Sequence, residues 1–124
     1  MKVGSLGEIS VQKEFILSGY EVYSPVTDNT KYDLIASKDG KVYTVEVKST
    51  NRKVGGFYRV QIKKVRSNKT RNVVTRFDNT QVDLLAIYIE PEDRVIVYKA
   101  EEITVGSELR VDMDGDLQRS VTRS

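Results

Sequence analysis

The feature that most constrains the fold is an Asp-Gly pair at residues 39 and 40, which separates two stretches of alternating apolar and polar residues. Both stretches lie within YDLIASKDGKVYTVEVKST, at residues 32–37 and 41–50. Alternation with a period of two is typical of strands that bury one face, and Asp-Gly between such strands is the strongest short hairpin signal. The sequence therefore predicts a β-hairpin with a two-residue turn.

A two-residue turn determines which residues face each other across the hairpin. Lys38 then pairs with Lys41, and counting back from this pair places Asp33 opposite Glu46. Facing Cβ atoms lie about 4.5 to 5.5 Å apart, and like charges at that distance are destabilising. Lys48 supplies one compensating charge on the same face, and a divalent cation between the carboxylates would supply more. A three-residue turn would shift the register and separate the two acids.

The composition limits the chemistry that such a site can perform. The 124 residues include no His and no Cys. This excludes disulfides, zinc sites built from thiolates or imidazoles, and Ser-His-Asp or Cys-His nucleophiles. Oxygen ligands remain, and Mg²⁺ is commonly held by one or two carboxylates plus substrate phosphate. We expect Mg²⁺ as the cofactor, with Mn²⁺ able to substitute for it.

The net charge of the whole chain is only +2, but the basic residues are concentrated in one segment at residues 51–78. No Asp or Glu lies between Glu46 and Asp78. A run of charge is usually a solvated face, but one without acids nearby favours a surface that binds nucleic-acid phosphates. The residues that we assign to DNA binding are Arg52, Lys53, Arg59, Lys63, Lys64, Arg66, Lys69, Arg71 and Arg76. Gln61 is a possible accessory residue, or simply a solvated one.

The N-terminal part of the chain predicts a helix that ends before Gly19. Ser5 and Glu8 match an S-x-x-E capping box, and Gly19 is a typical helix stop. Glu8 shares a helix face with Val11 and Phe15, so it extends an inward-facing stripe. Its carboxylate either contributes to the site or serves only as part of the cap.

The remaining sequence predicts further strands within a single domain. Strands are expected near residues 21–24, 57–62, 82–90 and 94–100, whereas 63–80 has no clear assignment. Within the C-terminal tail at 104–124, the stretch DMDGDLQ at residues 112–118 is expected to be turn or disorder, and the last dozen residues are expected to fray. No apolar run approaches the roughly 18 residues that a membrane span needs, and there is no signal-peptide pattern. We therefore expect a cytoplasmic protein without membrane contact.

The order of these features resembles the PD-(D/E)xK nuclease superfamily, which has the restriction-endonuclease-like fold. The stretches that carry the resemblance are GEISVQKEFILSGYEVYSPVTDNTKYDLIA, VEVKS and VDLLAIYIEPEDRVIVYKAEEI. They are most similar to the PD-(D/E)xK homing endonucleases associated with group I introns, and more distantly to Holliday junction resolvases. The similarity covers about residues 3–103 and is weakest over 51–78. Tyr32 stands where the superfamily motif has Pro.

The resemblance implies an α/β fold in which a mixed β-sheet is flanked by helices, formed by one nuclease domain over residues 1–124. It also implies that Asp33 and Glu46 are metal ligands, that Lys48 is the catalytic lysine, and that Glu8 completes the site. The implied activity is metal-dependent hydrolysis of DNA, of the homing type first and of the junction-resolving type second. The alternative from another class is a nucleic-acid-binding module that has lost catalysis.

The number of active sites predicts a homo-oligomer. One set of Asp33, Glu46 and Lys48 cuts one strand at a time, whereas both favoured substrates require two symmetric cuts. A homodimer or homotetramer with two-fold symmetry would present two sites. The aromatic residues that flank the basic segment are candidates for the interface, although a lone aromatic residue more often lies in the core: Phe57, Tyr58 and Phe77.

Overall fold

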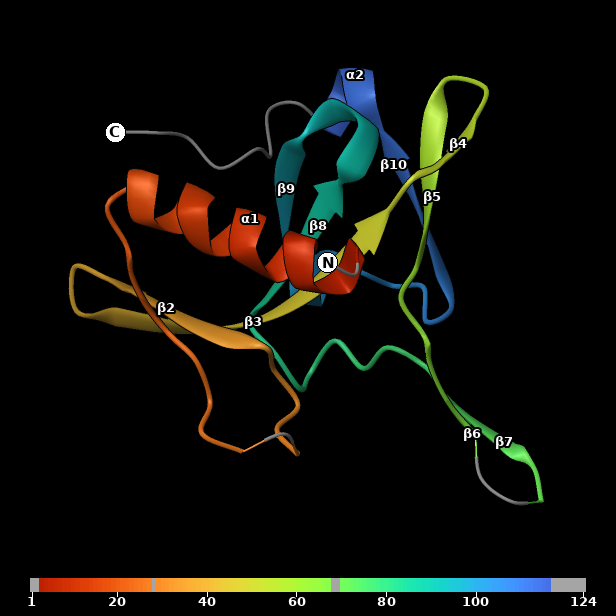
Figure 1. Ribbon diagram of the computed structural model, residues 1–124, viewed down its shortest axis with the longest axis horizontal. Helices are drawn as coiled ribbons and strands as arrows, with labels where there is room; N and C mark the ends of the chain where they lie inside the picture. Colours follow the sequence, from red (N-terminus) through yellow and green to blue (C-terminus); the bar gives the residue numbers. More distant parts are fainter. Residues whose placement is uncertain (1–2, 28, 68–69, 117–124) are drawn as a thin grey trace.

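The computed structural model describes residues 3–27, 29–67 and 70–116, with backbone only at residues 3–5, 66 and 67 (Figure 1). Helix α1 packs on one face of a five-stranded sheet, and a three-stranded sheet packs on the other. The helices and strands, in chain order, are α1 (Val3–Leu17), β1 (Glu21–Tyr23), β2 (Leu34–Lys38), β3 (Lys41–Thr50), β4 (Arg52–Val54), β5 (Phe57–Gln61), β6 (Lys64–Ser67), β7 (Asn72–Thr75), β8 (Leu84–Ile89), η1 (Glu90–Glu92), β9 (Arg94–Lys99), η2 (Ala100–Glu102), β10 (Glu108–Asp112) and α2 (Met113–Asp116).

The main sheet is mixed and has the strand order β1-β2-β3-β8-β9. Its central pair, β3 and β8, is parallel, and its other neighbours are antiparallel. The predicted α/β class with a mixed sheet is therefore confirmed. The second face of this sheet is covered by the small sheet β10-β5-β4, because residues 57–61 and 108–112 supply a second set of inward-facing apolar side chains.

The predicted hairpin is formed by β2 and β3 in the expected register. Asp39 and Gly40 both have positive φ, 54° and 77°, as a two-residue type I′ turn requires. Lys38 faces Lys41 and Leu34 faces Val45, where the regular pairing ends. The second predicted hairpin, β8 with β9, is also present.

Helix α1 ends as predicted but begins earlier than predicted. Gly19 has a φ of 91°, and the N–H of Tyr20 bonds to the carbonyl of Phe15 at 2.9 Å, which is the Schellman arrangement. The rings of Phe15 and Tyr20 meet edge to face at 5.0 Å. The helix begins at Val3, so Ser5 lies inside it and the predicted capping box is wrong. In a capping box the glutamate is the third residue of the helix, whereas Glu8 lies about one turn beyond that position in α1.

The C-terminal tail contains a strand that the sequence did not predict, and the expected turn or disorder at residues 112–118 is wrong over its described part. Residues 108–112 form β10, which pairs antiparallel with β5 along its whole length and buries Val111 completely. Residues 113–116 form the short helix α2, and 117–124 lie outside the described residues. The unassigned segment contains the hairpin β6–β7, which projects from the body of the molecule (Figure 1).

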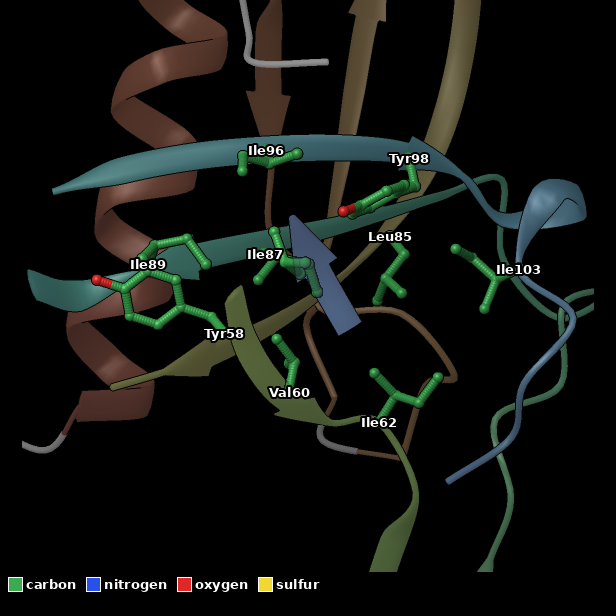
Figure 2. Packing of buried hydrophobic residues seen from close by; sticks show 10 residues of the cluster. Tyr58, Val60, Ile62, Leu85, Ile87, Ile89, Ile96, Tyr98 and Ile103 are labelled. Carbon is green, nitrogen blue, oxygen red and sulfur yellow. The ribbon is translucent and has the colours of Figure 1, made fainter. Parts of the chain in front are cut away.

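Two hydrophobic cores lie on opposite faces of the main sheet. Beneath α1 the buried residues are Val11, Phe15, Leu34, Ala36, Val45, Ala86, Tyr88 and Val95. Between the two sheets they are Tyr58, Val60, Ile62, Leu85, Ile87, Ile89, Ile96, Tyr98, Ile103 and Val111 (Figure 2). Tyr58 is only 1% exposed and Phe77 packs against this core, so for these two interface candidates the core alternative holds. Within the described part of the chain, no helix has the length and apolar character to cross a membrane.

Gly7 allows α1 to approach β3 closely, and this contact yields a test of the packing. A Cβ at residue 7 would overlap the Ser49 hydroxyl and lie 3.4 Å from the Ser49 Cβ. We expect Gly7→Ala to lower the free energy of unfolding by about 1 to 3 kcal/mol because of overpacking. The Ser49 hydroxyl is buried and has no hydrogen-bond partner among the described residues, so Ser49→Ala should restore stability to Gly7→Ala.

Urea denaturation of the two single variants and the double variant measures this coupling. Gly56→Ala is the matched control, since a Cβ there meets nothing within 4 Å. A double variant no more stable than Gly7→Ala would contradict the proposed contact. A double variant that is more stable than the wild type would fit the roughly 1 kcal/mol preference of a helix for Ala over Gly.

Candidate functional site

Asp33 lies directly before β2 and ends the ladder between β2 and β3. Its backbone N–H bonds to the carbonyl of Val45 at 2.9 Å, and its Oδ2 accepts a hydrogen bond from the N–H of Val47 at 2.7 Å. The Asp33 carboxylate is therefore held against the peptide that joins Glu46 to Val47. Asp33 is half-buried, and its other carboxylate oxygen has no partner among the contacts described.

Glu46 lies in the middle of β3 and is 4% exposed. On the parallel neighbour β8 it faces Leu85, a residue of the core between the sheets. A buried carboxylate requires a positive partner, and here the partner is Lys64, whose Nζ lies 2.9 Å from the Glu46 Oε1. Lys64 starts strand β6, so this ion pair connects the projecting hairpin to the centre of the molecule.

Lys48 and Glu8 complete the set of predicted site residues. Lys48 is half-buried two residues after Glu46, and it therefore points to the same side of β3. Glu8 belongs to α1, on the other side of the sheet. Burial raises the pKa of the Glu8 carboxyl above its ordinary value, and the negative charge of Asp33 raises it further. Asp33 therefore interacts with β3 through a hydrogen bond and with Glu8 of α1 through its charge.

A cavity of about 240 Å³ adjoins Glu46. Its wall combines cationic and apolar side chains with a few polar groups: Lys31, Glu46, Ile62, Lys64, Thr75, Arg76, Phe77, Asp78, Gln81 and Val82. The cationic side chains balance the acids and would accept a negatively charged group that enters beside Glu46. The cavity lies between the main sheet and the segment that leads to and from β6–β7.

The carboxylates at this site suit a hard divalent cation. Among the described residues no three acidic side chains converge closely enough to form a metal cluster by themselves. Asp33 and Glu46 each retain an oxygen beyond the contacts given above, and the Asp33 charge already perturbs Glu8. Two carboxylates completed by water and a substrate phosphate are the usual protein environment of Mg²⁺.

The described residues among those predicted to bind DNA are distributed over several elements. Arg52 and Lys53 lie on β4 and Arg59 on β5, all exposed on the small sheet. Lys63 precedes β6 and is half-buried, whereas Lys64 faces Glu46. The Nη1 of Arg76 donates to the Ser107 hydroxyl at 3.1 Å, and its guanidinium lies over Gly106. Arg71 is exposed between β6 and β7, the side chain of Arg66 is not described, and Lys69 lies outside the described residues.

Gln61 lies at the end of β5, exposed and opposite Glu108 on β10. Its neighbour Ile62 lines the cavity beside Glu46, but Gln61 itself does not.

The sequence did not assign three residues to this site, although it named Phe77 as an interface candidate and Lys64 as a DNA-binding residue. Lys31 and Phe77 line the cavity, and the role of Lys64 as the partner of Glu46 had no sequence signal. Lys64 is eighteen positions away from Glu46 in a segment without recognisable periodicity, and only the return of the chain from β5 brings them together.

The fold and this arrangement of carboxylates and lysine define the class of protein. The sequence profile of the PD-(D/E)XK endonuclease family matches residues 1–123. The chain belongs to the PD-(D/E)XK endonuclease family.

Two individual proteins are similar to the chain. A solved structure described as a bacterial homing endonuclease, I-Ssp6803I, superposes with a TM-score of 0.77 at 24% identity, covering 88% of this chain and 75% of that one. This likeness supports the restriction-endonuclease-like fold. Protein 5.3 of Escherichia phage T7 is 41% identical over 46 residues, which are 37% of this chain and 39% of that protein. The chain therefore spans well under half the length of this curated relative.

The ion pair between Lys64 and Glu46 predicts a specific loss of stability. Lys64→Met should leave the Glu46 carboxylate buried without its counter-charge. Because about half of the Lys64 side chain is exposed, solvent moderates the loss, and we expect a decrease of about 1 to 2 kcal/mol in the free energy of unfolding. Urea denaturation in EDTA measures this change.

Two further variants separate the ion pair from general effects of the substitution. Lys41→Met removes an exposed lysine at the β2–β3 turn and should change stability little. Adding Glu46→Gln to Lys64→Met removes the buried charge and should recover part of the loss. Equal effects of Lys64→Met and Lys41→Met would show that the ion pair does not stabilise the fold.

Proposed function

We propose that this protein is a metal-dependent endodeoxyribonuclease whose metal is held by Asp33 and Glu46. The observation that carries the proposal is the Asp33 carboxylate bonded to the Val47 N–H, directly beside the buried Glu46 and one residue from Lys48. Membership of the PD-(D/E)XK endonuclease family supports the same assignment. Mg²⁺ is the expected metal, and Mn²⁺ should substitute because both prefer oxygen ligands.

The residues of the chain would divide the work of phosphodiester hydrolysis. A divalent cation at Asp33 and Glu46 would lower the pKa of the attacking water and neutralise charge at the phosphate. Lys48, as a compact positive charge, would orient that water or stabilise charge on the phosphate oxygens. Glu8 would hold a proton more readily than an ordinary glutamate, because its pKa is raised. Without a bound cation it is therefore suited to hold a proton and to donate a hydrogen bond near Asp33, whereas a cation at Asp33 would favour its ionised form.

The cavity beside Glu46 supports a substrate with phosphate groups. Lys31, Lys64 and Arg76 lie in its wall, and Ile62 and Phe77 provide apolar surface for a sugar or base. Lys64 would contact both Glu46 and the substrate, so it belongs to the site and not only to the basic segment. Gln61 remains a possible accessory contact to the backbone of the substrate.

A homing-type endonuclease is the specific activity that we favour. The likeness in fold to a protein described as a homing endonuclease supports this choice over junction resolution. Supercoiled plasmids carrying candidate target sites, tested beside a synthetic four-way junction, distinguish the two activities. Cleavage at one plasmid locus supports homing, whereas symmetric nicks in the junction support resolution.

The metal pair predicts separate effects on cleavage and binding. Asp33→Asn, Glu46→Gln and Lys48→Met should each reduce cleavage by at least about a hundredfold, because each removes a group that acts on the reacting phosphate. The two acid substitutions should leave DNA binding intact or tighter, since each removes negative charge near phosphate. Cleavage in Mg²⁺ and binding in EDTA are the measurements.

Asp114→Asn is the matched control, because Asp114 lies in α2 on the exposed surface. It should cleave like the wild type. Wild-type cleavage by Asp33→Asn or Glu46→Gln would contradict the assignment of the site. Cleavage that persists in EDTA would contradict metal dependence.

Assembly of two or more chains is part of the proposal, because one site cuts one strand. We expect a homodimer or homotetramer that presents two sites to opposite strands. Sedimentation equilibrium at micromolar concentration should detect a species heavier than the 14.1 kDa chain. A monomer that nicks without making double-strand breaks would contradict this expectation.

A further inference from the structure

Three arginines from three strands form one row across the small sheet. Arg52 on β4 faces Arg59 on β5, and Arg59 in turn faces Arg110 on β10. All three are exposed, on the face opposite the core that Tyr58 and Val60 enter. Arg110 lies in the C-terminal tail, where the sequence predicted no strand, so only the fold reveals this row.

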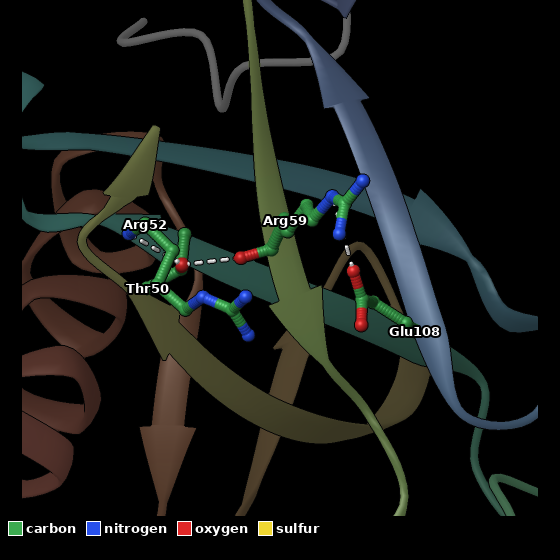
Figure 3. A network of polar contacts seen from close by, with 4 residues as sticks. All are labelled: Thr50, Arg52, Arg59 and Glu108. Carbon is green, nitrogen blue, oxygen red and sulfur yellow. Dashed lines mark hydrogen bonds and ion pairs between the residues drawn. The ribbon is translucent and has the colours of Figure 1, made fainter. Parts of the chain in front are cut away.

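Thr50 aligns two members of the row with the strand that carries the candidate site. Its hydroxyl donates to the carbonyl of Arg59 at 2.5 Å and accepts from the N–H of Arg52 at 3.1 Å (Figure 3). Thr50 is buried at the end of β3, two residues after Lys48. The row therefore has a defined position relative to Glu46 and Lys48.

An aromatic ring orders the guanidinium groups of the row. The guanidinium of Arg110 lies 3.8 Å from the centre of the Phe57 ring, and that of Arg59 lies 5.9 Å from the same ring. Stacking of this kind restricts the planar guanidinium group, so less conformational entropy is lost when it binds a phosphate.

The charges of the row are only partly compensated within the protein. Like charges that face each other across a sheet are destabilising. In the part of the chain that the structure describes, Arg59 pairs with Glu108 at 3.4 Å, an exposed contact that is screened by solvent (Figure 3). Asp112 is the other acid of β10 on this side, and its Oδ1 accepts from the N–H of Asp114. Arg52 and Arg110 have no ion pair with a described acid.

We propose that this row is a second DNA-contacting surface, which binds the phosphate backbone outside the cleavage site. Strands lie about 4.8 Å apart, so three neighbours span about 10 Å. One DNA strand places a phosphate about every 3.4 Å along the helix axis, so the row reaches up to about three phosphates. Its contacts are to phosphate, and it strengthens binding without reading sequence. The inference rests on the proposed function for the identity of the polyanion as DNA.

The test compares Arg52→Gln/Arg110→Gln with a charge-matched control, Lys13→Gln/Lys41→Gln. Both control lysines are exposed, on α1 and at the β2–β3 turn. Binding to a duplex of about two to three helical turns is measured in EDTA between about 50 and 200 mM salt. The arginine variant should flatten the plot of log K against log salt by about 1.8, or about 0.9 per arginine, for every duplex sequence. The control should keep the wild-type slope.

Thermal melting of the arginine variant first establishes that it is folded. A wild-type salt slope in the folded variant overturns the inference. An equal change of slope in the lysine control also overturns it. A change in the oligomeric state of the arginine variant without DNA overturns it as well, because the row would then be an interface between copies of the chain. Because binding is measured without metal, this test does not depend on catalysis. A wild type that binds DNA in EDTA but never cleaves it in Mg²⁺ or Mn²⁺ would contradict the proposed function and leave this inference standing.

Discussion

The side chains of β3 alternate between two layers, and the rest of the structure depends on this alternation. Val45 and Val47 point toward α1 and contribute to the core beneath it. Glu46 and Thr50 point toward the small sheet, where one meets Lys64 and the other binds the backbone of Arg59. Because a slip of one residue would exchange the two sets, the register of β3 fixes the core and the candidate site together.

The burial of Glu46 connects local electrostatics to the global topology. A carboxylate at that depth needs a cation, and the chain provides one from a hairpin that projects from the body. The same cation lies in the wall of the cavity where a phosphate group would enter. On the proposed function, stability and substrate binding would share this lysine, and substitutions at Lys64 should affect both.

The basic segment shows how tertiary structure distributes charges that are adjacent in sequence. Lys64 faces the buried Glu46, Arg76 packs on Gly106, and Arg59 joins a row of arginines on an outer face. Acids from distant parts of the sequence partner two of these residues, although no acid is near them in the chain. Counting charges along the sequence identifies a basic segment, but it does not identify which charges remain for DNA.

By itself the sequence determined the β2–β3 hairpin and its register, since an Asp-Gly turn and a period of two are local properties. It likewise placed Asp33 beside the β3 segment that carries Glu46, and it predicted that α1 ends before Gly19. Only the tertiary structure decided that β10 is a strand, that Lys64 pairs with Glu46, and that Arg110 completes a row. These features depend on contacts between residues far apart in the chain, for which short alternating segments carry no local signal.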